Sequence, residues 1–533
     1  MTLQNFDAQS PEAKSADLLA DNITRLRALF PELVTESGKG VAINVDVLKS
    51  LVGDAAVTDA DEKYGLNWHG KRRARQIALT PSTGTLRPCP EESVDWDTTQ
   101  NLMIEGDNLE VLKLLQKSYA GKVKLIYIDP PYNTGKDFVY PDSFQDSIRN
   151  YLELTGQTEG GAKISSNTEA SGRFHTDWLN MIYPRLRLAR SLLKDDGIIF
   201  VSIDSNEVSN LRLVMDEVFG AECFVIDLIW KKRDGAPNDR NIGSVHEHIL
   251  AYGKTLSSGS FRTIGEDRLN LMPRTEKADA EYQVFKEPGG PDPRGRFRKI
   301  DTTANAKGGR DVASLHFGVK NPNTGEVCYP RDGTCWRHSQ EEMERLQADG
   351  RLYWGVSGAA STPMRKLFIS EAKPGMTTPS ILPDMPLNQH AARELEVLFG
   401  QKSVFDTPKP TELLKLLAHL GSGSDDICLD FFAGSGSFGE AIMKLNSADA
   451  GQRRFVLVQL PEPIGDSADV RIPREYCERL GKPTLLTELT KERLRRAAGN
   501  IARAEQRKVG DLGFRVFKLD TSNIRAWSPN RSD

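Results

Sequence analysis

The chain has 533 residues, of which 38% are hydrophobic and 27% are charged. This length allows two to four domains with well-buried cores, and this composition excludes both a mini-protein and a chain that is disordered throughout. No apolar run reaches the roughly 18 residues of a membrane span, and the chain does not open with a basic segment followed by an apolar one. We therefore expect a cytoplasmic protein without membrane contact.

Charge and cysteine are distributed unevenly. The formal net charge is −4, yet residues 231–310 hold sixteen Lys and Arg against eleven Asp and Glu, which makes this stretch the candidate contact for a polyanion. Six cysteines in a chain of this length do not form a disulfide framework. Cys328, Cys335 and His338 come nearest to metal-ligand spacing, but a fourth ligand is missing, so we predict no metal site.

The first hundred residues differ from the rest. Apolar residues recur at helical spacing from Ser15 to about Gly53, and Leu51 to Pro90 is polar and broken by glycine and proline. This pattern predicts a small N-terminal helical domain over residues 1–100.

From Asn101 onward, apolar strands alternate with helices. The predicted strands are LMIEGD, VKLIYID, GIIFVSID and FVIDLIW, and helices are expected over residues 109–119, 177–193 and 207–219. Continuous apolar strands separated by helices indicate an α/β fold whose parallel sheet is covered on both faces.

The alternation fades between residues 231 and 380 and then resumes. Helices are expected over residues 411–419 and 438–445, and the strands ICLDFF and RFVLVQL follow them in turn. One sheet is therefore predicted in two halves, residues 101–230 and 381–510, with an inserted domain at 231–380 and a C-terminal tail at 511–533.

The tetrapeptide Asp129-Pro130-Pro131-Tyr132, the DPPY corner, follows a predicted strand. Two prolines fix the backbone, so the Asp129 carboxylate and the Pro130 carbonyl become rigid acceptors beside an aromatic face. Acceptors aimed at the two hydrogens of a nucleobase amine would stabilise the positive charge that develops when its nitrogen attacks carbon. A bare strand-to-turn junction with Asp129 as a helix cap is the structural alternative.

A glycine loop follows the strand ICLDFF in the second half of the predicted sheet. It begins at Asp430, continues through Phe431 and Phe432, and carries Gly434 and Gly436 before a helix, where a ligand can approach the backbone. Gly434, Gly436 and Gly439 also match the dinucleotide pattern G-x-G-x-x-G, but Gln459 stands where that pattern wants an acid, so NAD is not favoured. A nucleoside pocket beside an amine-polarising corner points to S-adenosylmethionine as methyl donor.

At this point the chain resembles a known family. The order of DPPY corner, inserted segment and glycine loop resembles the circularly permuted beta class of DNA amino-methyltransferases. Longer segments are similar to the modification subunit of type III restriction-modification systems, among them NLMIEGDNLEVLKLLQKSYAGKVKLIYIDPPYNTGKDFVY, WLNMIYPRLRLARSLLKDDGIIFVSIDSNE, HEHILAYGK, TPKPTELL, RRFVLVQLPEP and GFRVFKLDTSNIRAW. The resemblance implies a permuted Rossmann-like S-adenosylmethionine-dependent methyltransferase fold with an inserted target-recognition domain.

The resemblance also implies site residues. Asp129, Pro130 and Tyr132 would hold and stack a flipped adenine, with Pro131 completing the corner. The residues implied for the cofactor are Asp107, Asp129, Lys409, Asp430, Phe431, Phe432, Gly434, Gly436 and Gln459. Asp107 reads equally well as a helix cap.

DNA contacts are expected from the basic stretch, because a base must leave the duplex to be modified. The candidates are Lys231, Lys232, Arg233, Arg240, Arg294, Arg296, Arg298 and Lys299. The polar segment from Pro141 to Phe174 is expected to form a mobile loop beside the active site. The expected partners are double-stranded DNA, a second copy of the chain and a restriction subunit with helicase and nuclease activity.

The sequence thus predicts methylation of adenine N6 in DNA. Methylation of cytosine N4 is the nearest alternative, although its corner more often begins with serine, and RNA or a protein glutamine amide are more distant substrates. A DNA-recognition subunit with a vestigial catalytic fold is the alternative from another class.

Overall fold

The structure, a computed structural model, describes residues 17–29, 34–37, 40–43, 47, 65–134, 174–237, 241–255, 269–305, 312–382, 384–504 and 510–521. Arg240 and the predicted loop from Pro141 up to residue 173 lie outside the described residues. The chain divides into two compact units, one made of Met1–Asn270 with Pro379–Asp533 and the other of Leu271–Thr378.

A ten-stranded sheet, counted over the described residues, forms the centre of the first unit. Its spatial order is β16 (Ile381–Leu382), β7 (Phe224–Lys231), β8 (His246–Gly253), β6 (Leu193–Ile203), β5 (Val123–Ile128), β17 (Ile427–Asp430), β18 (Arg454–Gln459), β4 (Leu102–Glu105), β19 (Arg515–Thr521) and β3 (Gly84–Pro88). Neighbouring strands are parallel except in the pairs that β8 and β3 make. Because β5 lies beside β17, the two predicted halves form one sheet.

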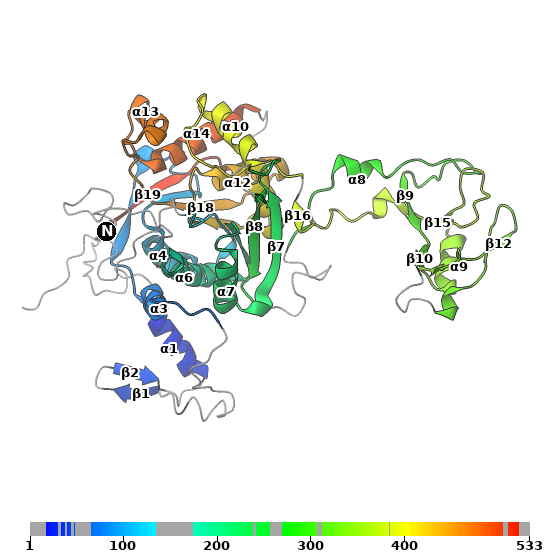
Figure 1. Ribbon diagram of the computed structural model, residues 1–533, viewed down its shortest axis with the longest axis horizontal. Helices are drawn as coiled ribbons and strands as arrows, with labels where there is room; N and C mark the ends of the chain where they lie inside the picture. Colours follow the sequence, from blue (N-terminus) through cyan, green and yellow to red (C-terminus); the bar gives the residue numbers. More distant parts are fainter. Residues whose placement is uncertain are drawn as a thin grey trace, which may run out of the picture. The chain divides into compact units, whose positions relative to one another are not determined.

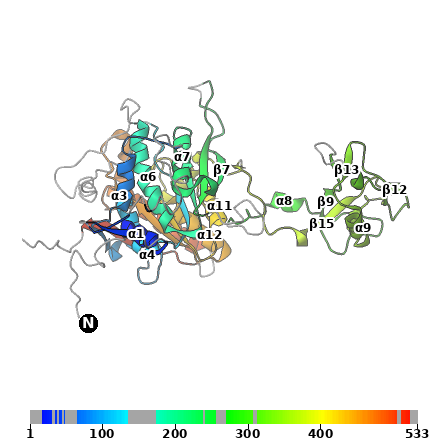
Figure 2. The same cartoon turned by 90° about the horizontal axis from the view of Figure 1, so that it is seen from below.

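Helices cover both faces of this sheet (Figure 1). One layer holds α3 (Lys71–Leu79), α4 (Asn108–Tyr119), α6 (Phe174–Leu192) and α7 (Val208–Phe219). Figure 2 shows α3, α6 and α7 of this layer from below. The other layer holds α10 (Asn388–Phe399), α11 (Thr411–Gly421), α12 (Ser437–Asp449) and α14 (Leu486–Ala504), with α13 (Arg471–Arg479) packed on α14.

Strand β5 is apolar at every position except Lys124, which pairs with Asp196 at 2.8 Å. All six of its residues are buried. Ile126 and Ile128 belong to the core shared with α4 and α6, whereas the Tyr127 ring stacks on Phe438 of α12 with centroids 5.4 Å apart. Because successive side chains point to opposite faces, a strand between two helix layers is apolar on both faces.

The described residues among the first hundred do not gather into a separate helical domain. Helix α1 (Leu18–Leu29) is present as predicted, but the hairpin of β1 (Val34–Ser37) and β2 (Gly40–Ile43) follows it. Farther along, α3 packs on α6, and β3 pairs with β19 at the edge of the main sheet. The prediction was wrong here because the short strand β3 is stabilised by a partner more than four hundred residues away, which local spacing does not reveal.

Two further boundaries differ from the prediction. The second unit begins at Leu271 rather than at Lys231, because β8 returns to the sheet between β7 and β6. Residues 515–521 are not a tail, since they form β19 beside β4. Within the described residues, no helix combines the length and apolar character needed to cross a bilayer.

The second unit is small and built from short strands. A three-stranded antiparallel sheet joins β14 (Leu352–Tyr353), β15 (Met364–Phe368) and β9 (Phe297–Asp301). Two antiparallel strand pairs accompany it, β10 (Thr303–Asn305) with β13 (Thr334–Trp336) and β11 (Val319–Lys320) with β12 (Val327–Cys328). Its helices are α8 (Glu276–Ala280) and α9 (Gln340–Ala348), and its core includes Trp336 and Phe297, both fully buried.

Candidate active site

The DPPY corner and the glycine loop begin at one edge of the sheet. Asp129 directly follows β5, and Asp430 is the last residue of β17. These strands are parallel neighbours in which Ile126 pairs with Leu429. Since the carboxyl ends of parallel strands meet at the same edge, the two motifs are adjacent although they are far apart in the sequence.

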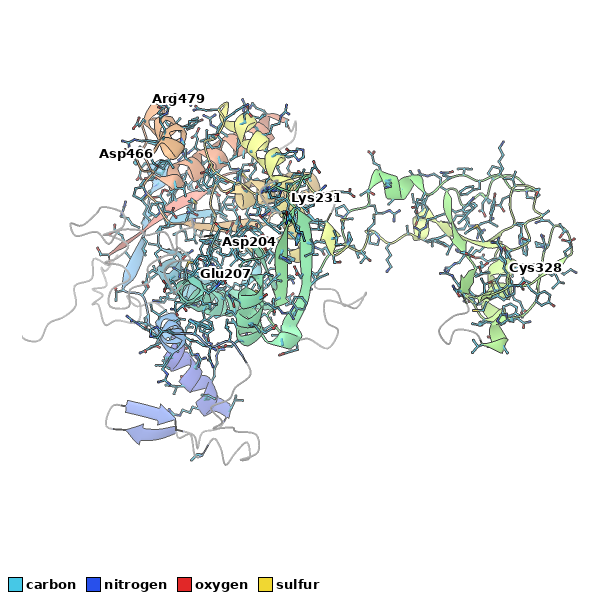
Figure 3. All side chains as sticks on the ribbon, viewed as in Figure 1. Asp204, Glu207, Lys231, Cys328, Asp466 and Arg479 are labelled. Atoms are coloured by element: carbon cyan, nitrogen blue, oxygen red, sulfur yellow. The ribbon has the colours of Figure 1, made fainter. Side chains whose placement is uncertain are left out.

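Buried hydrogen bonds hold the DPPY corner rigidly. The Trp178 indole donates a hydrogen bond to the Pro131 carbonyl at 2.7 Å, and not to the Pro130 carbonyl. Asn133, with a left-handed φ of 57°, donates from its side-chain amide to Glu207 Oε1 at 2.6 Å. Glu207 follows β6 and is fully buried (Figure 3). The corner is therefore fixed from α6 and from the end of β6.

Asp129 has one engaged and one free oxygen. Its Oδ2 lies 2.7 Å from the Lys409 ammonium nitrogen. Its Oδ1 is buried and has no hydrogen-bond partner among the described residues. Burial raises the pKa of the Asp129 carboxyl, although the Lys409 charge opposes this. A buried acceptor without a donor costs free energy, so this atom is suited to a ligand that brings an N–H group.

Tyr132 and Glu247 complete the surroundings of Asp129. The Tyr132 hydroxyl donates to Glu247 Oε2 at 3.0 Å, and the Lys409 nitrogen lies 4.9 Å from the centre of the Tyr132 ring. Lys409 also lies 3.5 Å from Glu247 Oε2, and Lys232 lies 3.1 Å from Glu247 Oε1. Sequence reasoning missed Glu247, although an acidic residue within the apolar strand HEHILAYG was an available signal.

The glycine loop bends back on the end of β18. Gly434 and Gly436 have left-handed φ angles of 51° and 82°. The Gly434 N–H donates to Gln459 Oε1 at 2.7 Å, and the Thr490 hydroxyl donates to the Gly434 carbonyl at 2.6 Å. Gln459, one of the residues implied for the cofactor, thus orders the loop through its amide oxygen, and a cofactor contact by Gln459 stays a prediction.

The acidic and aromatic residues of the loop are buried. Asp430 Oδ1 accepts from the Phe432 N–H at 2.9 Å, and burial raises the pKa of the Asp430 carboxyl well above its ordinary value. The Phe431 and Phe432 side chains belong to the main core. These two rings anchor the loop to the core, and a direct cofactor contact by them stays a prediction.

A buried arginine, Arg493 of α14, donates hydrogen bonds to serines of the glycine loop and of the helix that follows it. Only 1% of Arg493 is exposed. Its Nη1 donates to Ser435 Oγ and Ser437 Oγ, both at 2.6 Å, and its Nε donates to Glu440 Oε2 at 2.7 Å. Sequence reasoning missed Arg493, because an arginine in an amphipathic helix gives no local sign of being buried.

Asp107 caps α4. Its Oδ1 accepts from the N–H groups of Leu109 and Glu110 at 3.0 and 3.1 Å. The next residue, Asn108, donates to the Phe431 carbonyl at 2.6 Å. The cap reading is thus observed, and it ties the start of α4 to the glycine loop; a cofactor contact by Asp107 stays a prediction.

Comparison with known proteins identifies the family. A family model described as DNA methylase matches residues 123–452, which contain both motifs. The Mod subunit of the type III restriction-modification enzyme StyLTI from Salmonella typhimurium is 34% identical over 497 residues, which cover 92% of this chain and 71% of that protein. The chain belongs to the DNA methylase family, as a relative of the type III Mod subunits. The EcoP15I Mod subunit from Escherichia coli is 32% identical over 519 residues, covering 93% of this chain and 76% of its own length.

The expected activity class is confirmed by this membership: the protein is an S-adenosylmethionine-dependent DNA methyltransferase. Among solved structures, a putative DNA modification methylase from Thermus thermophilus covers 71% of this chain and 95% of its own at 14% identity. Its TM-score of 0.30 is too low to add to the assignment.

The edge formed by β5 and β17 fits S-adenosylmethionine. A Cβ built on Gly434 would meet nothing closer than Phe405 Cζ at 3.7 Å, so a ligand can lie against this backbone. Helix α12 starts directly after Gly436, and the positive end of a helix favours a carboxylate. Lys409, only 8% exposed, is a cation at the same edge, but in the structure its ammonium lies on Asp129.

The basic residues expected to contact DNA fall in both units. In the first unit, Lys231 pairs with Asp234 at 2.8 Å, Lys232 pairs with Glu247 inside the active site, and Arg233 is exposed. Arg240 lies outside the described residues. The sequence could not distinguish Lys232 from its neighbours, because its partner lies on the next strand.

In the second unit, four candidates lie on or just before β9. Arg294 is bound to Asp292 at 2.9 Å, and Arg298 is bound to Glu281 at 2.9 Å. Arg296 and Lys299 are exposed, and the Lys299 nitrogen lies 4.3 Å from the centre of the Phe285 ring. Arg296 and Lys299 therefore stay the stronger candidates for DNA contact in this unit.

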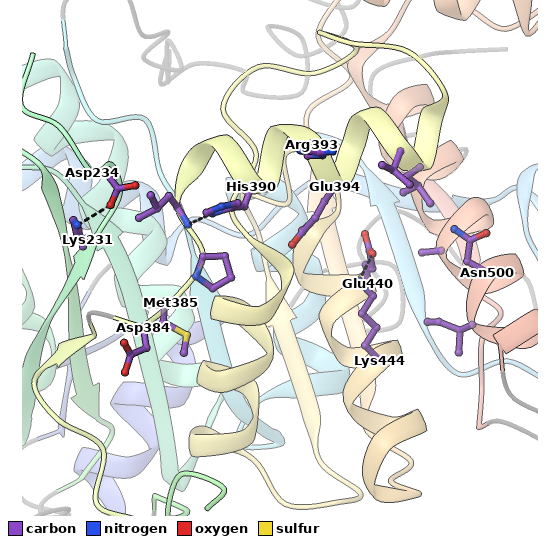
Figure 4. Close-up of a pocket in the computed structure, with 16 residues that line it drawn as sticks. Lys231, Asp234, Asp384, Met385, His390, Arg393, Glu394, Glu440, Lys444 and Asn500 are labelled. Carbon is purple, nitrogen blue, oxygen red and sulfur yellow. Dashed lines mark hydrogen bonds and ion pairs between the residues drawn. The ribbon is translucent and has the colours of Figure 1, made fainter. Parts of the chain in front are cut away.

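A pocket of about 790 Å³ lies elsewhere in the first unit, between α10, α12 and α14 (Figure 4). Lys231 is the one sequence-predicted site residue among those that line it. Glu440 and Lys444 of α12 line the pocket, whereas the glycine loop precedes that helix. It is therefore separate from the edge that carries the DPPY corner.

No metal-sized cluster in the described part of the chain includes Cys328, Cys335 or His338. Cys335 is buried on β13, and the Cys328 thiol donates to the Val319 carbonyl. Glu92, Glu105 and Glu488 do lie close together, but they surround the Lys491 ammonium, and Lys518 pairs with Glu92 and Glu105 as well.

Proposed function

We propose that the protein methylates N6 of adenine at a specific sequence in double-stranded DNA, as the modification and recognition subunit of a type III restriction-modification system. One observation carries the choice of an amine as acceptor. Among the described residues no donor reaches Asp129 Oδ1, a buried oxygen beside the Tyr132 ring and at the edge where the glycine loop begins. The names of three relatives, the type III Mod subunits of StyLTI, EcoP15I and EcoPI, support the biological setting.

The geometry suits a planar base that carries an NH2 group. Asp129 Oδ1 and the Pro130 carbonyl accept the two amine hydrogens, which favours a pyramidal nitrogen with an available lone pair. When bound, S-adenosylmethionine would supply an activated methyl group to that nitrogen. Asp129 Oδ1, in a carboxyl whose pKa is raised by burial, would accept the proton that the amine loses on methylation.

Tyr132 stacks on the flipped base in this account. Tyr132→Ala removes the ring, so we expect kcat/KM for DNA to fall about 10- to 100-fold, because stacking of a base on an aromatic ring stabilises by about 1–3 kcal/mol. The dissociation constant of S-adenosylmethionine, measured by calorimetry, should change less than about twofold, since the ring faces the base. An unaltered methylation rate would contradict the stacking role.

The partners follow from the same proposal. Residues 271–378 are the proposed target-recognition domain, with Arg296 and Lys299 at its surface. We further propose that two copies of the chain associate, and that a restriction subunit binds the assembly. The DNA substrate would place the protein in the cytoplasm.

Product analysis tests the proposal. Unmodified DNA is incubated with the protein and labelled S-adenosylmethionine, and the nucleosides are then separated by mass spectrometry. N6-methyladenine is expected, and sequencing of the modified DNA gives the recognition site. N4-methylcytosine, or transfer only to RNA or to a glutamine amide, would contradict the proposed substrate, and no transfer at all would indicate a vestigial catalytic fold.

A further inference from the structure

Glu247 is a buried carboxylate to which the DPPY chemistry gives no role. Glu247 lies on β8, where it pairs with Trp230 of β7. The following residue, His248, pairs with Ile203 at the carboxyl end of β6. Because β6 and β5 are parallel, β8 begins at the same edge at which Asp129 follows β5. Only 4% of Glu247 is exposed.

Both oxygens of Glu247 are engaged within the active site. Oε2 accepts the Tyr132 hydroxyl at 3.0 Å and lies 3.5 Å from the Lys409 ammonium. Oε1 lies 3.1 Å from the Lys232 ammonium. Burial of a carboxylate costs free energy unless it is paired, and here two cations and one hydroxyl compensate that cost.

Charge balance determines how the site can bind an amine. Asp129 and Glu247 carry two negative charges, and Lys409 and Lys232 carry two positive ones. Lys409 lies between the two carboxylates, 2.7 Å from Asp129 and 3.5 Å from Glu247. Lys409 and Lys232 outweigh burial and lower the pKa of Glu247, so Glu247 stays an anion that competes for Lys409.

We propose that Glu247 is a positioning residue that shares the Lys409 ammonium with Asp129 and anchors the Tyr132 hydroxyl. By holding Lys409, it keeps the Asp129 carboxylate available to the amine of the target base. By holding the hydroxyl, it fixes the plane of the stacking ring. This inference rests on the proposed function, because the amine is the ligand for which Asp129 is kept available.

The two neighbours of Lys409 give variants with opposite expected effects. Glu247→Gln keeps an oxygen for Tyr132 but loses the charge, so Lys409 is left to Asp129 alone and competes with the amine. Lys232→Met removes the other cation near Glu247, so Glu247 attracts Lys409 more strongly and Asp129 becomes more available. A purely structural role for Glu247 would not produce opposite signs.

The test measures recognition of the amine in the absence of cofactor. Dissociation constants are determined for two duplexes, one with adenine at the target position and one with purine, which lacks the amino group. The ratio of the purine constant to the adenine constant isolates the amine contact, since effects on overall DNA affinity cancel. We expect Glu247→Gln to lower this ratio about tenfold, as for a hydrogen bond to a charged group, and to lower kcat about 10- to 100-fold. Lys232→Met should raise the ratio.

A matched control lies outside the site. Glu217 accepts the Tyr183 hydroxyl at 2.8 Å and pairs with Lys71 and Arg75 at 2.6 and 3.1 Å, so it resembles Glu247 in its partners. Glu217→Gln should leave the ratio and kcat as in the wild type. Thermal unfolding verifies that each variant is folded, and Lys232→Met tests the inference even if Glu247→Gln does not fold.

The outcomes separate the inference from the proposed function. A Glu247→Gln variant with the wild-type ratio, or a Lys232→Met variant in which the ratio does not rise, would overturn the role of Glu247. A wild-type protein that methylates cytosine would overturn the proposed base alone. In that case the ratio of the constant for a pyrimidinone without the amino group to the constant for cytosine tests Glu247 in the same way.

Discussion

Asp129→Ala is expected to reduce methyl transfer to DNA by about 100- to 1,000-fold or more. The substitution removes the buried acceptor Oδ1, which receives an amine hydrogen, and loss of one preorganised hydrogen-bonding group at a reacting centre has effects of this size. The fold should persist, because a quarter of the Asp129 side chain is exposed and Lys409 retains Glu247 as a partner. Transfer of labelled methyl groups and thermal unfolding measure the two effects separately.

Asp520→Ala is a suitable control for this substitution. Asp520 lies on β19 and pairs with Arg87 at 3.0 Å in an exposed ion pair. Its removal should change neither the rate nor the stability measurably. An Asp129→Ala protein that methylates DNA at the wild-type rate would show that the DPPY corner does not bind the reacting amine.

Arg493→Met should lower the free energy of unfolding by about 3 kcal/mol, because it removes one partner of a buried charge pair and leaves Glu440 with Lys444 alone. It also removes the donors to Ser435 and Ser437, which flank Gly436 in the glycine loop. We therefore expect the affinity for S-adenosylmethionine to fall even in the fraction of protein that remains folded. Urea unfolding and calorimetry at a temperature well below the unfolding transition give the two values.

Arg503→Met provides the comparison on the same helix. Arg503 lies near the end of α14 and is exposed, and its hydrogen bonds to described residues go to Gly499 and Asn500 of its own helix. Its substitution should change the free energy of unfolding by less than about 0.5 kcal/mol. Equal effects of the two substitutions would mean that the buried network of Arg493 contributes nothing specific to the loop.

The sequence predicted the centre of the fold well and its margins poorly. Strands such as β5 and β17 have apolar residues at consecutive positions, and this composition identifies a strand between two helix layers from local information. β8 was assigned to the inserted domain because the alternation of strands and helices fades after residue 231. Its place in the sheet depends on pairing with β6 and β7, and β3 likewise depends on β19.

The site shows the same division. The DPPY corner and the glycine loop were found because each follows a strand, and parallel strands bring their carboxyl ends together. Lys409 was expected at the cofactor, but the structure places its ammonium on Asp129, 280 positions away in the chain. Glu247, Lys232 and Arg493 gain their roles from partners on other elements, so a local pattern could at most mark Glu247 as unusual and could not name the partners.

A complex with a short duplex that contains the recognition site and with sinefungin, an amine analogue of S-adenosylmethionine, would provide the most direct measurement. Crystallography of this complex should show sinefungin along Gly434, and an adenine out of the helix with its N6 within hydrogen-bond distance of Asp129 Oδ1 and its ring on Tyr132. Sinefungin between α10, α12 and α14 instead, or an adenine that remains paired in the duplex, would contradict a single cleft shared by the two motifs.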